Sequence, residues 1–370
     1  MEKVESVLYM PVFKWKLGEQ TATKSLSATQ KAQLLPIAEL QDRPYDWGLE
    51  EYSKSWDEHI DAVAKKTAEH WGKAHEIGFD QELTTEDELE SNADTTWQYL
   101  FRKLWTAGVQ AVPVLSSRAS KEEIDQIVAV SKAHGRSRYI LRYRIHAVDE
   151  EITPASLAGW FKTTLNTTGV PASDVDVVFD CDDFVSQWNL AATAPLATSL
   201  LAAVSAAASW RRVFLLSGGF PVNLAGIPKG THQLPRYDWT LFKLVNPLAQ
   251  ANGCKVLFGD YAVSHVDPFN EDPRVLKMTA NLRYTHADHW HVLKGASVKD
   301  KGFDQYRDLC KLLVNLPIYL GAPFSHGDKN YNDIADDVVP GPGNATHWRR
   351  DATNHHIHVV LRQLTTGKLP

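Results

Sequence analysis

The chain has 370 residues, and its 39 lysines and arginines stand against 45 aspartates and glutamates, which gives a net charge of −6. Hydrophobic residues make up 44% and charged residues 23%, which are ordinary globular values and exclude a disordered, collagenous or coiled-coil protein. The acidic balance excludes the strongly basic signature of a non-specific nucleic-acid coat and leaves room only for a local basic site.

The cysteines and the apolar runs indicate the compartment. Cys181, Cys254 and Cys310 are odd in number and far apart, so neither a disulfide framework nor a CxxC metal motif is expected. We find no apolar run that approaches the ~18 to 20 residues needed to cross a bilayer. The start, MEKVESVLYMPVF, has acidic residues where a secretory signal would be apolar. We therefore expect a cytoplasmic protein without a membrane partner.

Short Val-, Ile- and Leu-rich runs alternate with longer helical stretches along the whole chain. Near-continuous apolar strands separated by helices are typical of a parallel sheet covered on both faces, and eight of them predict an α/β (β/α)8 TIM-type barrel. An open doubly wound sheet is the runner-up, but no GxGxxG follows the first run. The eight runs are VLYMPVFKWK, LLPIAELQD, QAVPVLSS, YILRYRI, DVDVVFDCDD, RRVFLLSGG, CKVLFGDY and ANLRYT.

The stretches between and after these runs complete the prediction of a single domain over residues 1–370. Helical patterns fill the long connection between the second and third runs, which predicts a helical insertion at about 49–107. A loop and helices follow the eighth run and predict a C-terminal loop-helix extension at about 296–370. Its Gly-, Pro- and Asn-rich loop, at about 321–350, is long enough to be functional.

The carboxyl ends of the strands are the expected place for a site, because in a parallel barrel these ends and the loops after them form it. Successive strand residues point to opposite faces, so Lys14 is expected at the mouth, while Phe13 and Trp15 face the helices. Carboxylates, cations and tyrosines are thus expected to converge. They are Lys14, Lys16, Glu39, Arg142, Arg144, Asp180, Asp260, Tyr261, Arg283 and Tyr284.

Two interpretations of this convergence compete. Charged residues facing into an apolar barrel are costly to bury unless they are paired, so the set can be a structural cap of ion pairs. Several carboxylates that face several cations around one cleft are also the arrangement that binds an anionic substrate and performs acid–base or nucleophilic work.

Residues near the long loop are further candidates for substrate binding. Ser325 and Asp328 in the motif SHGD, together with Asn354 and His355, lie in or after this loop and could close over the mouth. Turn chemistry is the alternative for SHGD, because Ser, Gly and Asp all favour turns. Residues 217–219, Ser-Gly-Gly, can cradle a phosphate or simply form a tight turn.

Histidine clusters raise the question of a metal site. Imidazole is a common ligand for zinc, copper and nickel. However, HxxHxH matches no strong zinc pattern, and in NHHIH the side chain of Asn354 can simply cap the final helix. We predict no metal and no cofactor. The histidines concerned are His286, His289 and His291 in one cluster and His355, His356 and His358 in the other.

A series of short motifs carries a resemblance to a known family. From residue 9 to about residue 358 the chain reads PVFKWKLGEQTA, LLPIAEL, FDCDD, SGGFP, FGDY, NLRYT, SHGD and NHH in this order. Their number and order resemble the protein beta, or T4 beta protein, family, which is found in bacteria and mobile elements, often in phage-defence neighbourhoods. His326 stands where the family tends to have an aromatic residue in SxGD.

The resemblance implies a function, because the family is similar to phage-restriction DNA glycosylases that excise glucosylated hydroxymethylcytosine. The chain would then hydrolyse an N-glycosidic bond in modified phage DNA. One carboxylate would stabilise an oxocarbenium-like state while another activates water. Asp180 and Asp260 are the expected pair and Glu39 is the third candidate. The mouth cations would hold phosphates and the tyrosines would stack on the extruded nucleotide.

Two other classes of function stay open at this point. A metal-dependent phosphodiesterase or nuclease is favoured if the histidines bind metal. In a non-enzymatic sensor of a phage component, the cation-rich mouth would only bind. The expected partner is phage DNA that carries modified bases, and the sequence does not define an oligomeric state.

Overall fold

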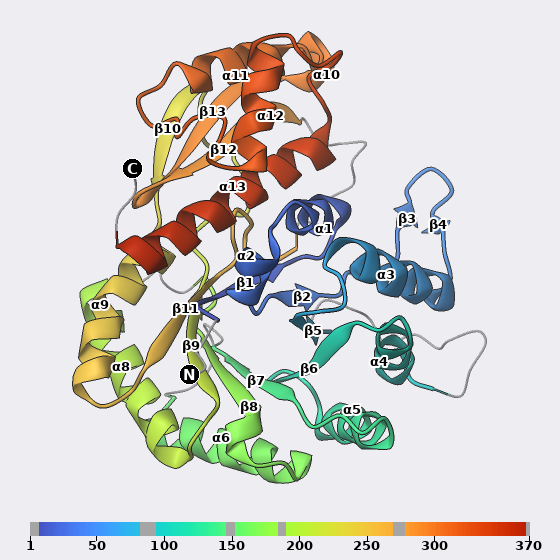
Figure 1. The fold of residues 1–370 in the computed structure, drawn as a ribbon, viewed down its shortest axis with the longest axis vertical. Coiled ribbons are helices and arrows are strands. Elements are labelled where there is room, and N and C mark those ends of the chain that lie inside the picture. The colour runs from blue at the N-terminus through green and yellow to red at the C-terminus, as the bar shows by residue number, and fades with distance from the viewer. Residues whose placement is uncertain (1–6, 82–93, 146–151, 184–189, 269–277, 368–370) are drawn as a thin grey trace.

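The computed structural model describes residues 7–81, 94–145, 152–183, 190–268 and 278–367. Within these ranges, eight parallel strands close into a barrel in the order β1-β11-β9-β8-β7-β6-β5-β2, so the predicted (β/α)8 architecture is confirmed (Figure 1). The strands are β1 (Tyr9–Phe13), β2 (Ile37–Glu39), β5 (Glu76–Asp80), β6 (Gln110–Ser116), β7 (Tyr139–Arg144), β8 (Val175–Asp180), β9 (Arg212–Ser217) and β11 (Val256–Asp260).

The third barrel strand, β5, lies inside the stretch for which a helical insertion was predicted, at about 49–107. This stretch contains α3 (Trp56–His70), β5 and α4 (Thr96–Thr106), so it is a regular part of the barrel. The strand is only five residues long and has Gly78 at its centre. A side chain at Gly78 would come within 2.8 Å of Cδ1 of Ile140 inside the barrel. The barrel therefore requires a glycine there, and this glycine weakens the apolar pattern that marks the other strands.

The run ANLRYT was predicted as the eighth barrel strand, and this assignment is wrong. It forms β12 (Thr279–His286), which pairs antiparallel with β13 (His289–Ser297). Together with β10 (Gly230–Pro235), these strands make a separate three-stranded sheet in the order β10-β13-β12. Burial in β12 largely alternates between buried and partly buried residues, which is typical of an antiparallel sheet and not of a fully covered parallel strand.

Helices cover the barrel and one face of the small sheet (Figure 1). A two-strand hairpin of β3 (Tyr45–Asp46) and β4 (Glu51–Tyr52) lies before α3. The remaining helices near the barrel are α1 (Leu17–Lys24), α2 (Ala28–Ala32), α5 (Lys121–Ala133), α6 (Pro154–Thr168), α8 (Leu190–Ala207) and α9 (Tyr237–Ala251). Near the small sheet are α10 (Val298–Lys301), α11 (Gln305–Val314) and α12 (His326–Ala335), and α13 (Ala345–Thr366) ends the chain's secondary structure.

Helix α13 joins the two parts, because it packs on α1 of the barrel and on α12 and β12 of the small sheet (Figure 1). A side chain at Gly18 would come within 2.7 Å of Cγ of Arg349, so the glycine allows α1 and α13 to approach closely. The helix starts at Ala345, nine residues before Asn354, and Asn344, which accepts from the amide of His347, is its N-cap. The suggestion that Asn354 caps the final helix is therefore wrong.

One helix departs from the expectation about apolar runs. Helix α8 is long and apolar enough to cross a membrane by length and composition alone. It packs against α6 and α9, and its Leu200, Leu201 and Val204 are fully buried in the layer between the barrel and the helices. Core helices pass the same test, so α8 is explained as a barrel helix with an apolar packing face.

Candidate functional site

The interior of the barrel changes from apolar to charged toward the carboxyl ends of its strands. Met10, Val12, Ile37, Ile140 and Val178 form part of the apolar cluster inside the barrel. One period of two further along the same strands lie charged side chains. These are Lys14, Glu39, Arg142 and Asp180, to which β5 adds Asp80. The face that the period-two pattern predicted for these residues is the face they occupy.

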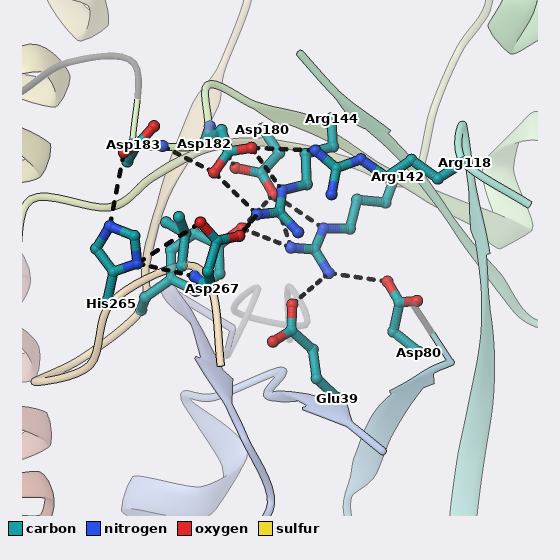
Figure 2. Close-up of polar contacts among 12 residues, drawn as sticks. Glu39, Asp80, Arg118, Arg142, Arg144, Asp180, Asp182, Asp183, His265 and Asp267 are labelled. Atoms are coloured by element: carbon teal, nitrogen blue, oxygen red, sulfur yellow. Dashed lines mark hydrogen bonds and ion pairs between the residues drawn. The ribbon is translucent and has the colours of Figure 1, made fainter. Parts of the chain in front are cut away.

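Arg142 is the centre of this charged layer. Its side chain is 0% exposed and contacts carboxylates from three other strands. Nε and Nη2 donate to Oδ2 of Asp180 at 2.9 and 2.7 Å, and Nη1 donates to Glu39 at 3.0 Å and to Asp80 at 2.8 Å. Figure 2 shows the guanidinium group between these three carboxylates. One cation thus holds three acidic side chains in one place.

Lys14 provides a second cation for Glu39. Its Nζ lies 2.5 Å from Oε2 of Glu39 and also donates to the carbonyl of Val266. Burial alone would raise the pKa of Glu39, but the charges of Lys14 and then Arg142 outweigh it and hold this pKa below its ordinary value. Glu39 is therefore ionised at neutral pH.

Tyr261 connects the layer to the loop after β11. Its hydroxyl donates to Oδ2 of Asp180 and accepts from Nη2 of Arg142, both at 2.6 Å. Burial raises the pKa of Tyr261 well above its ordinary value, so the phenol keeps its proton and remains a donor. The amide of Asp182 donates to the other oxygen of Asp180 at 2.9 Å, which fixes the carboxylate from both sides.

A second group of charges lies beside this layer (Figure 2). Arg144 forms a two-point ion pair with Asp182, with both contacts at 2.9 Å, and also reaches Asp267 at 3.3 Å. Arg118 donates to Asp182 at 3.2 Å. The side chain of Asp267 is 62% exposed, whereas that of Arg144 is fully buried, so this group links the buried layer to the surface.

Asp260 does not belong to the mouth, and its predicted position there is wrong. Its strand β11 directs Gly259 and Tyr261 inward, so Asp260 points outward toward α13. There it accepts from Tyr9 and lies 2.8 Å from Nε2 of His356. Burial would raise the pKa of Asp260, but the neighbouring His356 lowers it below its ordinary value.

A second buried carboxylate, that of Asp238, lies near Asp260 outside the barrel and is poorly paired. The side chains of Asp238 and Arg236 are both 0% exposed and lie 3.7 Å apart. Neither oxygen of Asp238 has a hydrogen-bond partner among the described residues. Burial, reinforced by the negative charge of Asp260, raises the pKa of Asp238 to about 7 against the pull of Arg236. This cluster therefore carries a cost in folding free energy that the mouth avoids by close pairing.

The candidates around the long loop lie together, but not at the mouth. Asp328 accepts from Tyr284 at 2.8 Å and from Ser325 at 2.5 Å, and it lies 2.7 Å from Nδ1 of His355. All four side chains are buried between α12, α13 and β12. The side chain of Asn354 is also buried and links the amide of Gly327 to α1. The expectation that these residues close over the mouth is therefore corrected: they join the small sheet to the helices.

Two predicted cations lie at the rim and not in the charged layer. Lys16 is exposed and precedes α1. Arg283 on β12 is partly buried and donates to the carbonyl of Val263, in the loop after β11. Arg349 on α13 donates to the same carbonyl. The loop after β11 thus connects Arg283 and Arg349 with Tyr261.

The fold keeps the first histidine cluster together, with the ring centres of His286 and His291 6.0 Å apart, and separates the second. His286, His289 and His291 lie on the hairpin of β12 and β13, whereas His355, His356 and His358 point to different partners. Among the residues that the structure describes, no group of three or more His, Cys, Asp or Glu side chains could hold a metal ion.

The Ser-Gly-Gly segment at residues 217–219 is tightly packed. The amide of Gly218 donates to the carbonyl of Asp182, and a side chain on Gly218 would come within 2.3 Å of Val266. Ser217 is the last residue of β9 and the amide of Gly218 is bonded within the fold, so the phosphate-cradle interpretation is wrong for Gly218, and the backbone at 217–219 does not form a tight turn either.

Several residues of the site were not predicted from the sequence. Asp80 was missed because its strand was not recognised, although its period-two relation to Gly78 would have placed it at the mouth. Arg118 and Asp267 lie in loops, where no periodicity gives a direction. Arg349 lies at the start of α13, in the stretch assigned to a loop, and only the contact of α13 with the barrel brings it to the rim.

These features define an α/β barrel protein with a buried charged layer at the carboxyl ends of its strands. The model of the Beta protein family matches residues 9–362. The chain belongs to this family, and the resemblance seen in its motifs is confirmed. A search of curated proteins found no match.

Solved structures with a similar course of the chain come from several enzymes. Apo homocysteine methyltransferase MmuM from Escherichia coli is 11% identical with a TM-score of 0.39, over 70% of this chain and 92% of that one. The carboxyl transferase domain Y628A of Rhizobium etli pyruvate carboxylase with pyruvate is 9% identical with a TM-score of 0.37, over 96% of this chain and 49% of that one. A GH18 chitinase from Pseudoalteromonas aurantia is 10% identical with a TM-score of 0.26, over 60% and 92%.

Proposed function

We propose that the chain is a hydrolase that cleaves the N-glycosidic bond of a modified base, glucosylated hydroxymethylcytosine, in phage DNA, and that it acts in antiviral defence. The observation that carries the proposal is the fully buried Arg142 shared by Glu39, Asp80 and Asp180. A buried ion network is weak as a stabilising device, because apolar packing of similar volume is often at least as stable. Its position at the carboxyl ends of barrel strands is where catalytic groups of this fold lie.

The reaction divides between the carboxylates. The bond between the sugar C1′ and the base nitrogen breaks, its electron pair leaves with the base, and positive charge develops on the sugar. Asp180 stabilises this charge, and Arg142, Tyr261 and the amide of Asp182 hold it in position. Ionised Glu39 accepts a proton from the water that attacks C1′, and this proton then passes through solvent to the departing base, so that Glu39 is ionised again at the end of the reaction. Asp260, which points out of the barrel, has no direct role.

The rest of the layer orients these groups. Arg142 contacts Asp180 through two nitrogens and Glu39 through a third, so the two carboxylates keep a fixed separation. Tyr261 lies under both Lys14 and Arg142, whose charges lie 5.4 and 5.7 Å from the centre of its ring. Such cation–π contacts add to the rigidity of the layer. Preorganisation of this kind is what an oxocarbenium-stabilising carboxylate needs.

The test is a comparison of DNA substrates. Purified chain is incubated with glucosylated phage DNA and with unmodified DNA of the same sequence, each with and without a chelator. We expect abasic sites in the modified DNA only, with no effect of the chelator. Direct strand breaks that the chelator abolishes would instead identify a metal-dependent nuclease or phosphodiesterase. Retention of the DNA without abasic sites or breaks would identify a sensor.

A further inference from the structure

Three cations from distant parts of the chain gather at the rim of the barrel. Arg283 and Arg349 both donate through Nη1 to the carbonyl oxygen of Val263, at 2.6 and 2.9 Å. Two guanidinium groups that share one neutral acceptor must lie side by side. Lys16, exposed at the start of α1, is close enough for the charge of Arg349 to act on its pKa.

The charge of this group is poorly compensated. In the described part of the chain, neither Arg283 nor Lys16 forms an ion pair, and the ion pair of Arg349 with Glu19 is long, at 3.9 Å. Burial, and then repulsion from Arg349, lowers the pKa of Arg283 well below its ordinary value. Burial also lowers the pKa of Lys16. The carboxylate of Glu19 acts on this set as well: its charge raises the pKa of Lys16, whereas the charge of Arg349 lowers it. An anion placed here would relieve this repulsion.

The cations at the mouth, unlike those of the rim, are closely paired with carboxylates. Lys14, Arg142 and Arg144 are each held by carboxylates of the barrel. A phosphate could reach them only by replacing buried ion pairs, and breaking such a pair leaves an uncompensated buried charge. The sequence assigned phosphate binding to all these cations together, and the structure separates them into two sets.

The geometry points to the rim set of Arg283, Arg349 and Lys16 as a binding site for a phosphodiester group of DNA. Two planar guanidinium groups match the oxygens of a phosphate, and the exposed lysine adds a point charge. Arg283 is held from behind by Phe220, whose ring centre lies 4.5 Å away. Arg349 also donates to Oγ of Ser264, and its side chain is 30% exposed.

The position of the rim set suits a substrate that reaches into the barrel. The loop that carries Val263 and Ser264 begins at Tyr261, which contacts Asp180, and continues to Val266, whose carbonyl accepts from Lys14. A phosphate beside the nucleotide under attack would therefore sit at the rim while its sugar reaches toward the mouth. The identity of the ligand as DNA rests on the proposed function, whereas the preference for a phosphate rests on the rim cations.

The experiment measures the binding of a labelled, unmodified single-stranded oligonucleotide as a function of salt. The variants are Arg283→Gln, Arg349→Gln and the double variant. Lys16→Gln is included because its side chain is exposed, and substitutions of exposed side chains usually change stability little. The matched control is Lys65→Gln with Lys66→Gln, which removes two exposed cations from α3. We expect each arginine variant to weaken binding at least tenfold and to reduce the slope of log affinity against log salt by about 1.

The results separate the rim site from the proposed function, because binding is measured without catalysis. Weakening by the rim variants and not by the α3 control supports the site, even if no abasic sites ever form on modified DNA. Equal binding by the rim variants and the original chain overturns the site, even if the chain proves to be a glycosylase. Inorganic phosphate is tested in parallel. If it raises the melting temperature only when Arg283 and Arg349 are present, but no oligonucleotide binds, the ligand is a free phosphate and the DNA assignment is wrong.

Discussion

At each end of the barrel, an aspartate of strand β8 forms an ion pair with an arginine of a neighbouring strand. At the amino end Asp176 forms a two-point pair with Arg212, at 2.7 and 2.9 Å. At the carboxyl end Asp180 is bound by two nitrogens of Arg142, at 2.9 and 2.7 Å. The two carboxylates have nearly the same local geometry and nearly the same burial. An ion pair in the barrel is therefore no mark of a functional site by itself.

The two ends differ in how the charges are shared. At the amino end Asp176 faces Arg211 and Arg212, and Glu76, which is 28% exposed, lets the network reach water. At the carboxyl end one fully buried arginine serves three fully buried carboxylates. In the carboxyl-end arrangement, three acidic side chains are buried away from water, and one of them accepts from the hydroxyl of Tyr261. This excess of held carboxylates, and not pairing as such, is what distinguishes a candidate active site from a structural cap.

The largest expected effect on stability comes from removing the shared cation. Arg142→Met removes the cation that Asp180, Asp80 and Glu39 share, and only Glu39 is known to keep a second cation, Lys14, so we expect a loss of about 3 to 5 kcal/mol in unfolding free energy. Arg212→Met should cost less, about 1 to 2 kcal/mol, because Arg211 remains and the network reaches solvent. Urea unfolding at neutral pH measures both. Equal losses would mean that the two ends are the same kind of ion-pair cap.

The cluster of Asp238, Arg236 and Asp260 outside the barrel should make the stability of the fold depend on pH, which the close pairs of the mouth should not. The folded chain keeps a proton on Asp238 up to about pH 7, whereas the unfolded chain releases it near pH 4. The folded state therefore binds more protons between these values, and its stability falls as the pH rises through this window. From about pH 5 to about pH 8 we expect a loss of about 2 to 3 kcal/mol from this group.

Asp238→Asn is the corresponding variant, since its amide does not titrate. Its unfolding free energy should lack this part of the pH dependence and should exceed that of the original chain at about pH 8. Urea unfolding at several pH values provides the measurement. Parallel pH profiles for the two chains would show that Asp238 is ionised in the folded state.

The smallest effect is expected at the solvent side of the mouth. Asp267 lies 3.3 Å from Arg144, but its side chain is 62% exposed and Arg144 keeps its two-point pair with Asp182. Asp267→Asn should therefore change the unfolding free energy by less than about 1 kcal/mol. A larger loss of stability in thermal or urea unfolding would mean that Asp267, in the loop after β11, contributes to stability as the buried charged layer does.

The sequence predicted the parts of this picture that depend on strand periodicity. The apolar runs revealed seven of the eight barrel strands, and the period of two placed Lys14, Glu39, Arg142 and Asp180 on the inner face. The position of Asp260 could not be predicted in this way. The residue of β11 that faces the barrel next to it is Gly259, which has no side chain whose polarity would indicate the inner face. Contacts between distant segments, such as that of Arg349 with Val263, leave no trace in local pattern.

The central claim is that the carboxyl-end layer performs the reaction and the amino-end layer does not. The direct measurement compares Asp180→Asn with Asp176→Asn for the release of abasic sites from glucosylated phage DNA, with urea unfolding of both variants. Each variant removes one charge from the same strand and the same kind of ion pair. We expect Asp180→Asn to lower the rate at least about 100-fold with a stability loss within about 2 kcal/mol, since Arg142 keeps Glu39 and Asp80, and Asp176→Asn to stay within a few-fold of the original rate. Equal rates for the two folded variants would contradict the assignment of the site to the mouth.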